Sequence, residues 1–240
     1  MKSKTMFNAY IDGFNLYKGS LEKRPALKWL DLMALSKALM PNYELGEIYY
    51  FTAPLKKKFP EDRANERQHA YLRVLEDQGI RVIRGKFRRS ESWLRMQSKN
   101  REEFVQPPFS SILGFNQWQI KNIFSTALPD YPMANVTKFE EKGSDVNLAA
   151  HLLRDVYKNS LLAALVITGD SDLNTPIQFA VENSVYVKVI RPGNGGKSDH
   201  ISKIASEVSN LNLELLGECL LKNPHKIKSG SDIYKPITWN

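Results

Sequence analysis

Three separate stretches of the chain carry carboxylates of a kind that can bind a divalent cation. Asp170 and Asp172 follow the apolar run 161–168, which is typical of a strand buried on both faces of a sheet. Asp12 follows the first expected strand, and Asp145 stands at the start of an expected helix. Neighbouring carboxylates repel one another, and a divalent cation is a common compensation. Because these ligands would all be oxygens, the set favours Mg²⁺ or Mn²⁺.

Each acid also has a purely structural interpretation. An aspartate between a strand and a glycine, as at position 12, is typical of a turn, and Asp145 fits an ordinary helix N-terminal charge. Asp172 could cap the helix that follows it. Asn15 could hold a metal-bound water or a phosphate oxygen, or could satisfy loop backbone. Thr168 and Ser171 flank the acid pair and are candidate hydroxyl supports for it. The shared turn of Asp170 and Asp172 favours one common site over unrelated structural roles.

The elements that would position these acids alternate between strands and helices, which predicts an α/β domain with a parallel sheet covered on both faces. We expect strands at 5–11, 47–53, 80–85, 136–139, 161–168 and 185–190. We expect helices at 30–40, 61–78, 172–182 and 199–207, and one that begins at 143–144. In such a sheet, ligands gather beyond the carboxyl ends of the strands, which is where Asp12 and Asp170 are expected.

The periodicity degrades at about 86–136, which we interpret as an insertion with a short helix near 117–128. We therefore expect one domain over residues 1–210 that contains this insertion, followed by a C-terminal extension at 211–240 with an irregular tail from 224 onward.

The composition favours a polyanionic partner, because the 240 residues carry a formal net charge of +8. Basic and aromatic residues alternate over 81–101, including Arg88 and Arg89, which suits single-stranded nucleic acid; an ordinary solvated face is the alternative. Lys197 lies in a glycine-rich loop that could hold a phosphate. That loop is not a P-loop, because Arg191 stands where the motif needs glycine.

The single cysteine excludes an intramolecular disulfide and a cysteine-based zinc site, and we expect Cys219 to be buried among leucines. No apolar run reaches the length of a membrane span, and the N-terminus lacks the apolar region of a signal peptide. We therefore expect a cytoplasmic protein with no membrane partner and leave homodimerisation open.

The three acidic stretches resemble, in the same order, the three motifs of the NYN domain, a family of PIN-like nucleases that includes the LabA group. They are Tyr10-Ile11-Asp12-Gly13-Phe14-Asn15-Leu16, Glu141-Lys142-Gly143-Ser144-Asp145-Val146-Asn147-Leu148 and Ile167-Thr168-Gly169-Asp170-Ser171-Asp172-Leu173. The resemblance spans about 5–205, apart from the insertion. It implies a PIN-like three-layer α/β/α sandwich with a mostly parallel central sheet, a Mg²⁺ or Mn²⁺ site and ribonuclease activity. Carried over by position, it makes Asp12, Asp145, Asp170 and Asp172 the catalytic and metal-site acids, with Asn15 beside them.

Two features depart from the family pattern. His151 stands where many members carry a further acid, which bears on metal affinity, and the insertion lacks the cysteine pairs of some members.

The expected function is therefore a metal-dependent endoribonuclease that binds single-stranded RNA through Asn15, Arg88, Arg89 and Lys197. The alternative is a catalytically weak or inactive RNA-binding or regulatory module, which His151 favours. A phosphatase for a small phosphoester ranks last, because the first strand offers no second acid after Asp12-Gly13-Phe14.

Overall fold

The computed structural model describes residues 4–55, 61–95, 133–158, 160–193, 200–228 and 230–239. The chain divides into two compact units, one formed by residues 1–87 and 141–240 and the other by residues 88–140. The second unit covers most of the insertion expected from the sequence. Its described part comes from β4 (Lys86–Arg95) and β5 (Met133–Lys142), which pair with each other in a two-stranded sheet.

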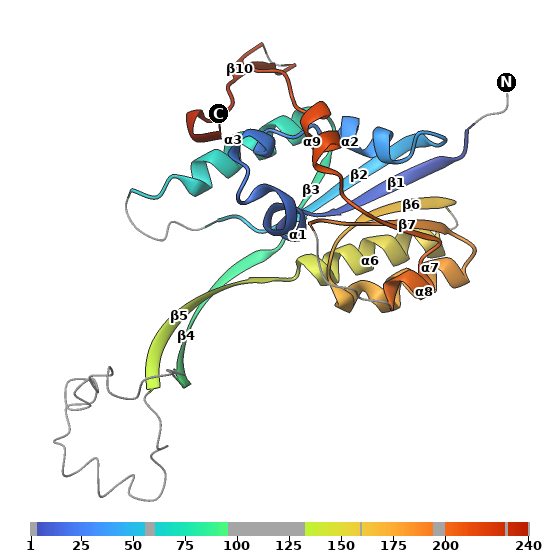
Figure 1. The fold of residues 1–240 in the computed structure, drawn as a ribbon, viewed down its shortest axis with the longest axis horizontal. Helices are drawn as coiled ribbons and strands as arrows, with labels where there is room; N and C mark the ends of the chain where they lie inside the picture. The colour runs from blue at the N-terminus through green and yellow to red at the C-terminus, as the bar shows by residue number, and fades with distance from the viewer. Residues whose placement is uncertain are drawn as a thin grey trace, which may run out of the picture. The chain divides into compact units, whose positions relative to one another are not determined.

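A six-stranded sheet forms the centre of the first unit (Figure 1). Its strands are β1 (Met6–Asp12), β2 (Glu44–Thr52), β3 (Arg81–Arg84), β6 (Ala163–Ile167), β7 (Tyr186–Arg191) and β8 (Glu207–Asn210). They lie in the order β3-β2-β1-β6-β7-β8, and every neighbouring pair is parallel.

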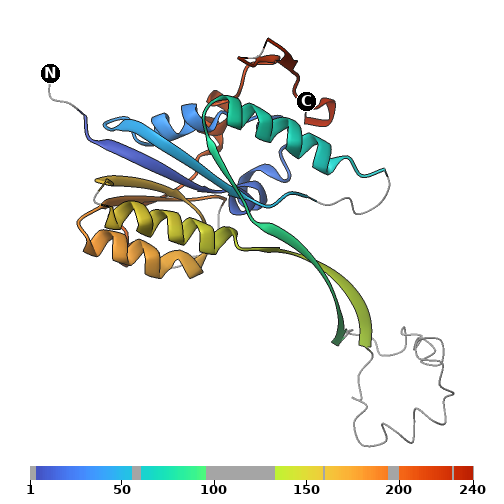
Figure 2. The ribbon, with the colours of Figure 1, turned by 180° about the vertical axis from the view of Figure 1, so that it is seen from behind.

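Helices cover both faces of this sheet, as Figures 1 and 2 show. One face carries α2 (Leu32–Leu39), α3 (Ala64–Asp77) and α9 (Leu213–Glu218). The other carries α6 (Ser144–Tyr157), α7 (Asn174–Glu182) and α8 (Ile201–Ile204).

The packing of β6 shows why this strand is apolar throughout. Leu165 and Ile167 belong to the core on the α2 and α3 face, whereas Ala164 and Val166 belong to the core on the α6 and α7 face. Successive side chains of a strand point to opposite faces, so a strand between two helical layers buries every residue. The expected three-layer α/β/α sandwich with a mostly parallel sheet is confirmed, and this sheet is parallel throughout.

The strand order reverses its direction between β1 and β6. If only the strands of this sheet are numbered in chain order, β6 is the fourth strand and the order is that of a doubly wound fold. In that fold the winding direction reverses between the first strand and the fourth, which here are β1 and β6. In such folds, ligands bind outside the carboxyl ends of the strands at this reversal. Asp12 closes β1 and Thr168 follows β6, so both stand at the reversal.

Several segments differ from the sequence-based expectations. Within 199–207 the structure has only the short helix α8, and the strand β8 follows. This edge strand was missed because its sequence, Glu-Val-Ser-Asn, has little apolar alternation. The expected strand at 136–139 is part of β5, and the irregular start of the insertion is the strand β4. The helix expected near 117–128 lies outside the described residues.

The C-terminal segment is more ordered than the sequence suggests. It contains α9, the short strands β9 (His225–Lys226) and β10 (Asp232–Ile233), and the 3₁₀ turn η5 (Ile237–Trp239). The Trp239 ring lies 6.2 Å from the rings of both Trp29 and Tyr71, so the segment packs on the core beside α3. Cys219 is buried, as expected. No helix among the described residues has the length and apolarity needed to cross a membrane.

Candidate functional site

Asp12 is the buried centre of the carboxyl edge of the sheet. Only 1% of its surface is exposed, yet its carboxylate accepts three hydrogen bonds. Asn15 donates its backbone N–H to Oδ1 at 2.9 Å and its side-chain amide to Oδ2 at 2.6 Å. The Thr168 hydroxyl donates to Oδ2 at 3.2 Å. The carboxylate also caps the short helix α1 (Gly13–Leu16), so its position is fixed from both β1 and β6.

Glycine at position 13 lets the chain turn tightly against β2. A Cβ atom there would lie 2.5 Å from Cζ of Tyr50 and 2.7 Å from the carbonyl oxygen of Phe51. No side chain fits in this space. Gly13 opens the helix α1 directly after β1, and this helix start holds Asn15 against the carboxylate of Asp12.

Thr168 connects the end of β6 to both acids. Its hydroxyl donates to Asp12 and accepts the backbone N–H of Asp170 at 3.1 Å. Asp170 Oδ1 in turn accepts the backbone N–H of Asp172 at 2.9 Å and caps the 3₁₀ turn η4 (Ser171–Leu173). The expectation that Asp172 could cap the next helix is wrong, since Asp170 provides the cap and α7 begins with no side-chain cap. The Asp172 side chain is exposed.

Asp145 reaches the same neighbourhood from the start of α6. Gly143 precedes this helix with φ +91°, a left-handed conformation that favours glycine. Burial and, after it, the negative charges of Asp12, Asp170 and Asp172 together raise the pKa of Asp145 to about 6. The structure therefore brings the four predicted acids, from three segments of the chain, close enough to repel one another.

Opposing influences act on the pKa of Asp12. Burial is the largest influence and raises its pKa, and the charge of Asp170 acts in the same direction. The hydrogen bonds from Asn15 and Thr168 oppose this shift, because they stabilise the ionised form.

The acids form a region of like charge rather than a closed set of ligands. Among the described residues, no three His, Cys, Asp or Glu side chains are grouped so that they could hold one metal ion. The all-oxygen chemistry and the mutual repulsion at Asp145 nevertheless fit a hard divalent cation, which would remove the repulsion. Binding one would require the carboxylates to move toward a common point.

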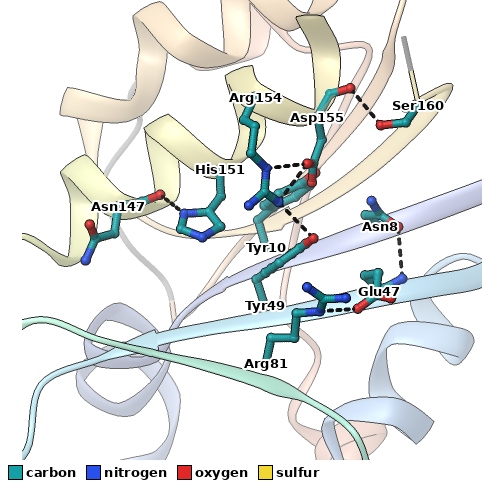
Figure 3. A network of polar contacts seen from close by, with 10 residues as sticks. All are labelled: Asn8, Tyr10, Glu47, Tyr49, Arg81, Asn147, His151, Arg154, Asp155 and Ser160. Atoms are coloured by element: carbon teal, nitrogen blue, oxygen red, sulfur yellow. Dashed lines mark hydrogen bonds and ion pairs between the residues drawn. The ribbon is translucent and has the colours of Figure 1, made fainter. Parts of the chain in front are cut away.

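A polar network joins α6 to the tyrosines of β1 and β2 (Figure 3). Asp155 is 5% exposed; it accepts hydrogen bonds from the Tyr10 hydroxyl at 2.8 Å and from Arg154 Nε at 2.8 Å. Arg154 also donates to the Tyr49 hydroxyl at 2.9 Å. The tyrosines on the α6 face of β1 and β2 were the sequence signal for this buried network.

His151 packs between this network and the acidic edge. Its Nδ1 lies 2.8 Å from the carbonyl oxygen of Asn147, so this nitrogen carries the proton that it donates. Its ring centroid lies 5.4 Å from that of Tyr49 and 5.5 Å from that of Phe51. Phe51 pairs with Asp12 across β1 and β2, so His151 packs on the residue of β2 that lies next to Asp12.

The predicted RNA contacts outside the acid cluster are only partly placed. Arg88 and Arg89 lie on β4, in the second unit, and Lys197 lies outside the described residues. Asn15, by contrast, lies directly on Asp12.

Comparison with known proteins gives two distant similarities. No family model matches the sequence. The chain is 26% identical over 255 residues to the 6-hydroxy-3-succinoylpyridine 3-monooxygenase HspA of Pseudomonas putida, covering 96% of this chain and 74% of HspA. A crystal structure of VPA0982, a protein of unknown function from Vibrio parahaemolyticus, matches with a TM-score of 0.49 at 12% identity, over 92% of this chain and 99% of that one.

Proposed function

We propose that the protein is a cytoplasmic, metal-dependent endoribonuclease that hydrolyses phosphodiester bonds in RNA. The observation that supports the proposal is the position of Asp12 and Asp170 at the reversal point of the sheet, where Thr168 joins them. Asp145 lies near enough for burial and the charges of Asp12, Asp170 and Asp172 to raise its pKa to about 6. A parallel sheet has its ligand crevice at this place, and an uncompensated acid cluster there calls for a cation.

The proposed cofactor is Mg²⁺ or Mn²⁺. Asp12, Asp145, Asp170 and Asp172 would hold such an ion, which would supply positive charge to phosphate oxygens and lower the pKa of bound water. Asp12 provides the fixed point of the cluster, because Asn15 and Thr168 orient both of its oxygens. Asp170 is oriented by its own turn through Asp172 N–H and Thr168. Asp145 can exchange a proton near neutral pH, so its charge can respond to the arrival of a cation.

The proposed substrate follows from charge. The net charge of +8 favours a polyanion, and a site built from carboxylates repels phosphate unless a cation lies between them. RNA satisfies both conditions when a divalent ion is present. Arg88, Arg89 and Lys197 are proposed to bind the phosphates of a single strand.

Cleavage of end-labelled single-stranded RNA tests the proposal. With Mg²⁺ or Mn²⁺ we expect cleavage that EDTA abolishes and that Asp170→Asn lowers by about 100-fold or more, since one charged oxygen in the site is lost. Asp232→Asn is the matched control, because Asp232 is exposed on β10. Equal cleavage by the wild type and Asp170→Asn would contradict the assignment.

Two other outcomes have distinct readouts. A non-catalytic RNA-binding module would show salt-sensitive RNA binding without Mn²⁺ binding in calorimetry.

The name of HspA suggests hydroxylation of a small aromatic substrate, and the doubly wound strand order suits a nucleotide cofactor. However, Asp-Gly-Phe-Asn follows β1 in place of a glycine-rich fingerprint, so a pyrophosphate would face Asp12. Oxygen uptake that depends on the pyridine named for HspA and on a reduced nicotinamide would favour the oxygenase.

A further inference from the structure

Two aromatic side chains lie exposed immediately after the acid that closes β1. Phe14, on α1, is 43% exposed, and Tyr17, the first residue of the π-helical turn η1 (Tyr17–Leu21), is 38% exposed. The tyrosine and phenylalanine of β1 itself, Tyr10 and Phe7, are at most 1% exposed. The aromatic side chains of this stretch are therefore buried before Asp12 and exposed after it, at Phe14 and Tyr17.

Lysine side chains accompany both rings. Lys18 Nζ lies 6.0 Å from the ring centroid of Phe14, and Lys28 Nζ lies 5.0 Å from that of Tyr17. Glu22 is the one acid among them, and its pKa is lowered chiefly by its hydrogen bond from Lys18 and then by the charges of Lys18, Lys23 and Lys28. Three lysines thus surround one glutamate, which leaves this surface positive beside the negative carboxylates of the site.

The segment that carries the rings is anchored to the core. Leu16 and Leu21 are buried, and the Ser20 hydroxyl accepts the backbone N–H of Gly193 at 3.1 Å. A Cβ atom at Gly19 would lie 2.6 Å from the carbonyl oxygen of Pro192, so the backbones of η1 and the loop after β7 are in close contact. Rings presented from a fixed backbone lose little conformational entropy when they bind a ligand.

We infer that residues 13–28 form a stacking platform for the bases of single-stranded nucleic acid. Phe14 and Tyr17 supply the ring surfaces, and Lys18, Lys23 and Lys28 pair with the phosphates. Exposed aromatics interleaved with cations are the combination that sequence-tolerant single-strand binding uses. The first ring of the platform, Phe14, stands two residues after Asp12, so a strand stacked on it would pass the acid cluster. For its role in cleavage, though not for its binding of bases, this inference rests on the proposed function.

Fluorescence anisotropy with a labelled oligouridine tests the platform. EDTA is included so that cleavage cannot occur. We expect Phe14→Ala to raise the Kd about tenfold, the loss of one stacked base, and Phe14→Trp to keep it within about twofold. Phe179→Ala is the matched control, because Phe179 is 42% exposed but lies on α7. Circular dichroism melting verifies that each variant is folded.

An abasic strand of the same length separates stacking from charge. We expect the wild type and Phe14→Ala to bind it equally, because it offers no bases. Three results would overturn the inference: no binding of oligouridine by the wild type, equal binding by the wild type and Phe14→Ala, or the same loss on the abasic strand.

The two proposals fail in different ways. Weakened binding by Phe14→Ala without any RNA cleavage would leave the platform standing and remove the nuclease. Cleavage of RNA together with unchanged binding by Phe14→Ala would remove the platform alone.

Discussion

Asp145 is the residue at which the electrostatics of the site can be measured most directly. It lies at the start of a long helix, where the helix dipole favours a carboxylate, yet its pKa is raised to about 6. Burial and three carboxylates therefore outweigh the dipole. A residue that is unfavourable to the fold in its ionised form, but placed with other acids, is typical of a functional position.

This imbalance predicts a pH-dependent stability difference for Asp145→Asn in EDTA. The folded-state pKa is raised above the unfolded value near 4, so the stability linked to Asp145 is complete below pH 4 and is lost as the pH rises through about 6. Asparagine cannot ionise. We therefore expect the variant to be more stable than the wild type at pH 8 by about 1 kcal/mol after allowance for partial exposure, or about 3 °C in Tm.

Differential scanning calorimetry at pH 4 and pH 8 checks this expectation. The two proteins should melt together at pH 4. A difference in Tm that is the same at both pH values would show that ionisation of Asp145 is not its source.

At the scale of elements, the site depends on how β1 and β6 end. Thr168 is fully buried, and its hydroxyl is used twice, as a donor to Asp12 and as an acceptor from Asp170 N–H. This single side chain sets the direction in which the chain leaves β6. It also joins the halves of the sheet that meet at the reversal point.

Replacement of this hydroxyl by a methyl group should separate the two strand ends. Thr168→Val keeps the shape of the side chain but leaves the Asp170 N–H and one oxygen of Asp12 without this partner. We expect a loss of about 1–3 kcal/mol in urea unfolding, with an unchanged m-value. Thr168→Ser should retain most of the stability, and Thr175→Val, on the exposed side of α7, serves as the control. Equal midpoints for the wild type and Thr168→Val would refute the role of the hydroxyl.

The strands that carry the site could be predicted because they are buried on both faces. An apolar run such as that of β6 leaves few alternatives, and the positions of Asp12 and Asp170 at strand ends follow from it. The edge strand β8 was missed, since partial exposure permits polar side chains that blur the pattern. The strand β4 was missed because most positions of its sequence are charged or polar. The buried state of Asp155 was also missed, because its partners Tyr10 and Arg154 become visible only once β1 and α6 are packed together.

At the scale of the whole molecule, the first unit contains both hydrophobic cores. All of the described core residues lie outside 88–140. The chain leaves and re-enters this unit at neighbouring points, because a Cβ atom at Gly85 would lie 2.8 Å from the carbonyl oxygen of Lys142. The insertion is thus attached through a narrow pair of chain segments.

Removal of the insertion should therefore spare the fold. We expect a variant in which a short Gly-Ser linker replaces residues 88–140 to unfold cooperatively and to retain a parallel-sheet circular dichroism spectrum. If Arg88 and Arg89 pair with phosphates, the slope of log K against log salt for single-stranded RNA should fall by about 1.4, or about 0.7 for each phosphate that is no longer neutralised. Loss of cooperative unfolding would show that the insertion is required for the fold. An unchanged slope would exclude the two arginines as phosphate ligands.

The same attachment has a consequence for the integrity of the chain. A proteolytic cut within 88–140 would yield two fragments that share the sheet through the β1–β6 ladder, from Phe7 opposite Ala163 to Ile11 opposite Ile167. The N-terminal fragment carries Asp12, and the C-terminal fragment carries Asp145 and Asp170. Neither fragment alone holds the acid cluster, so two separately produced halves would regain it only by complementation.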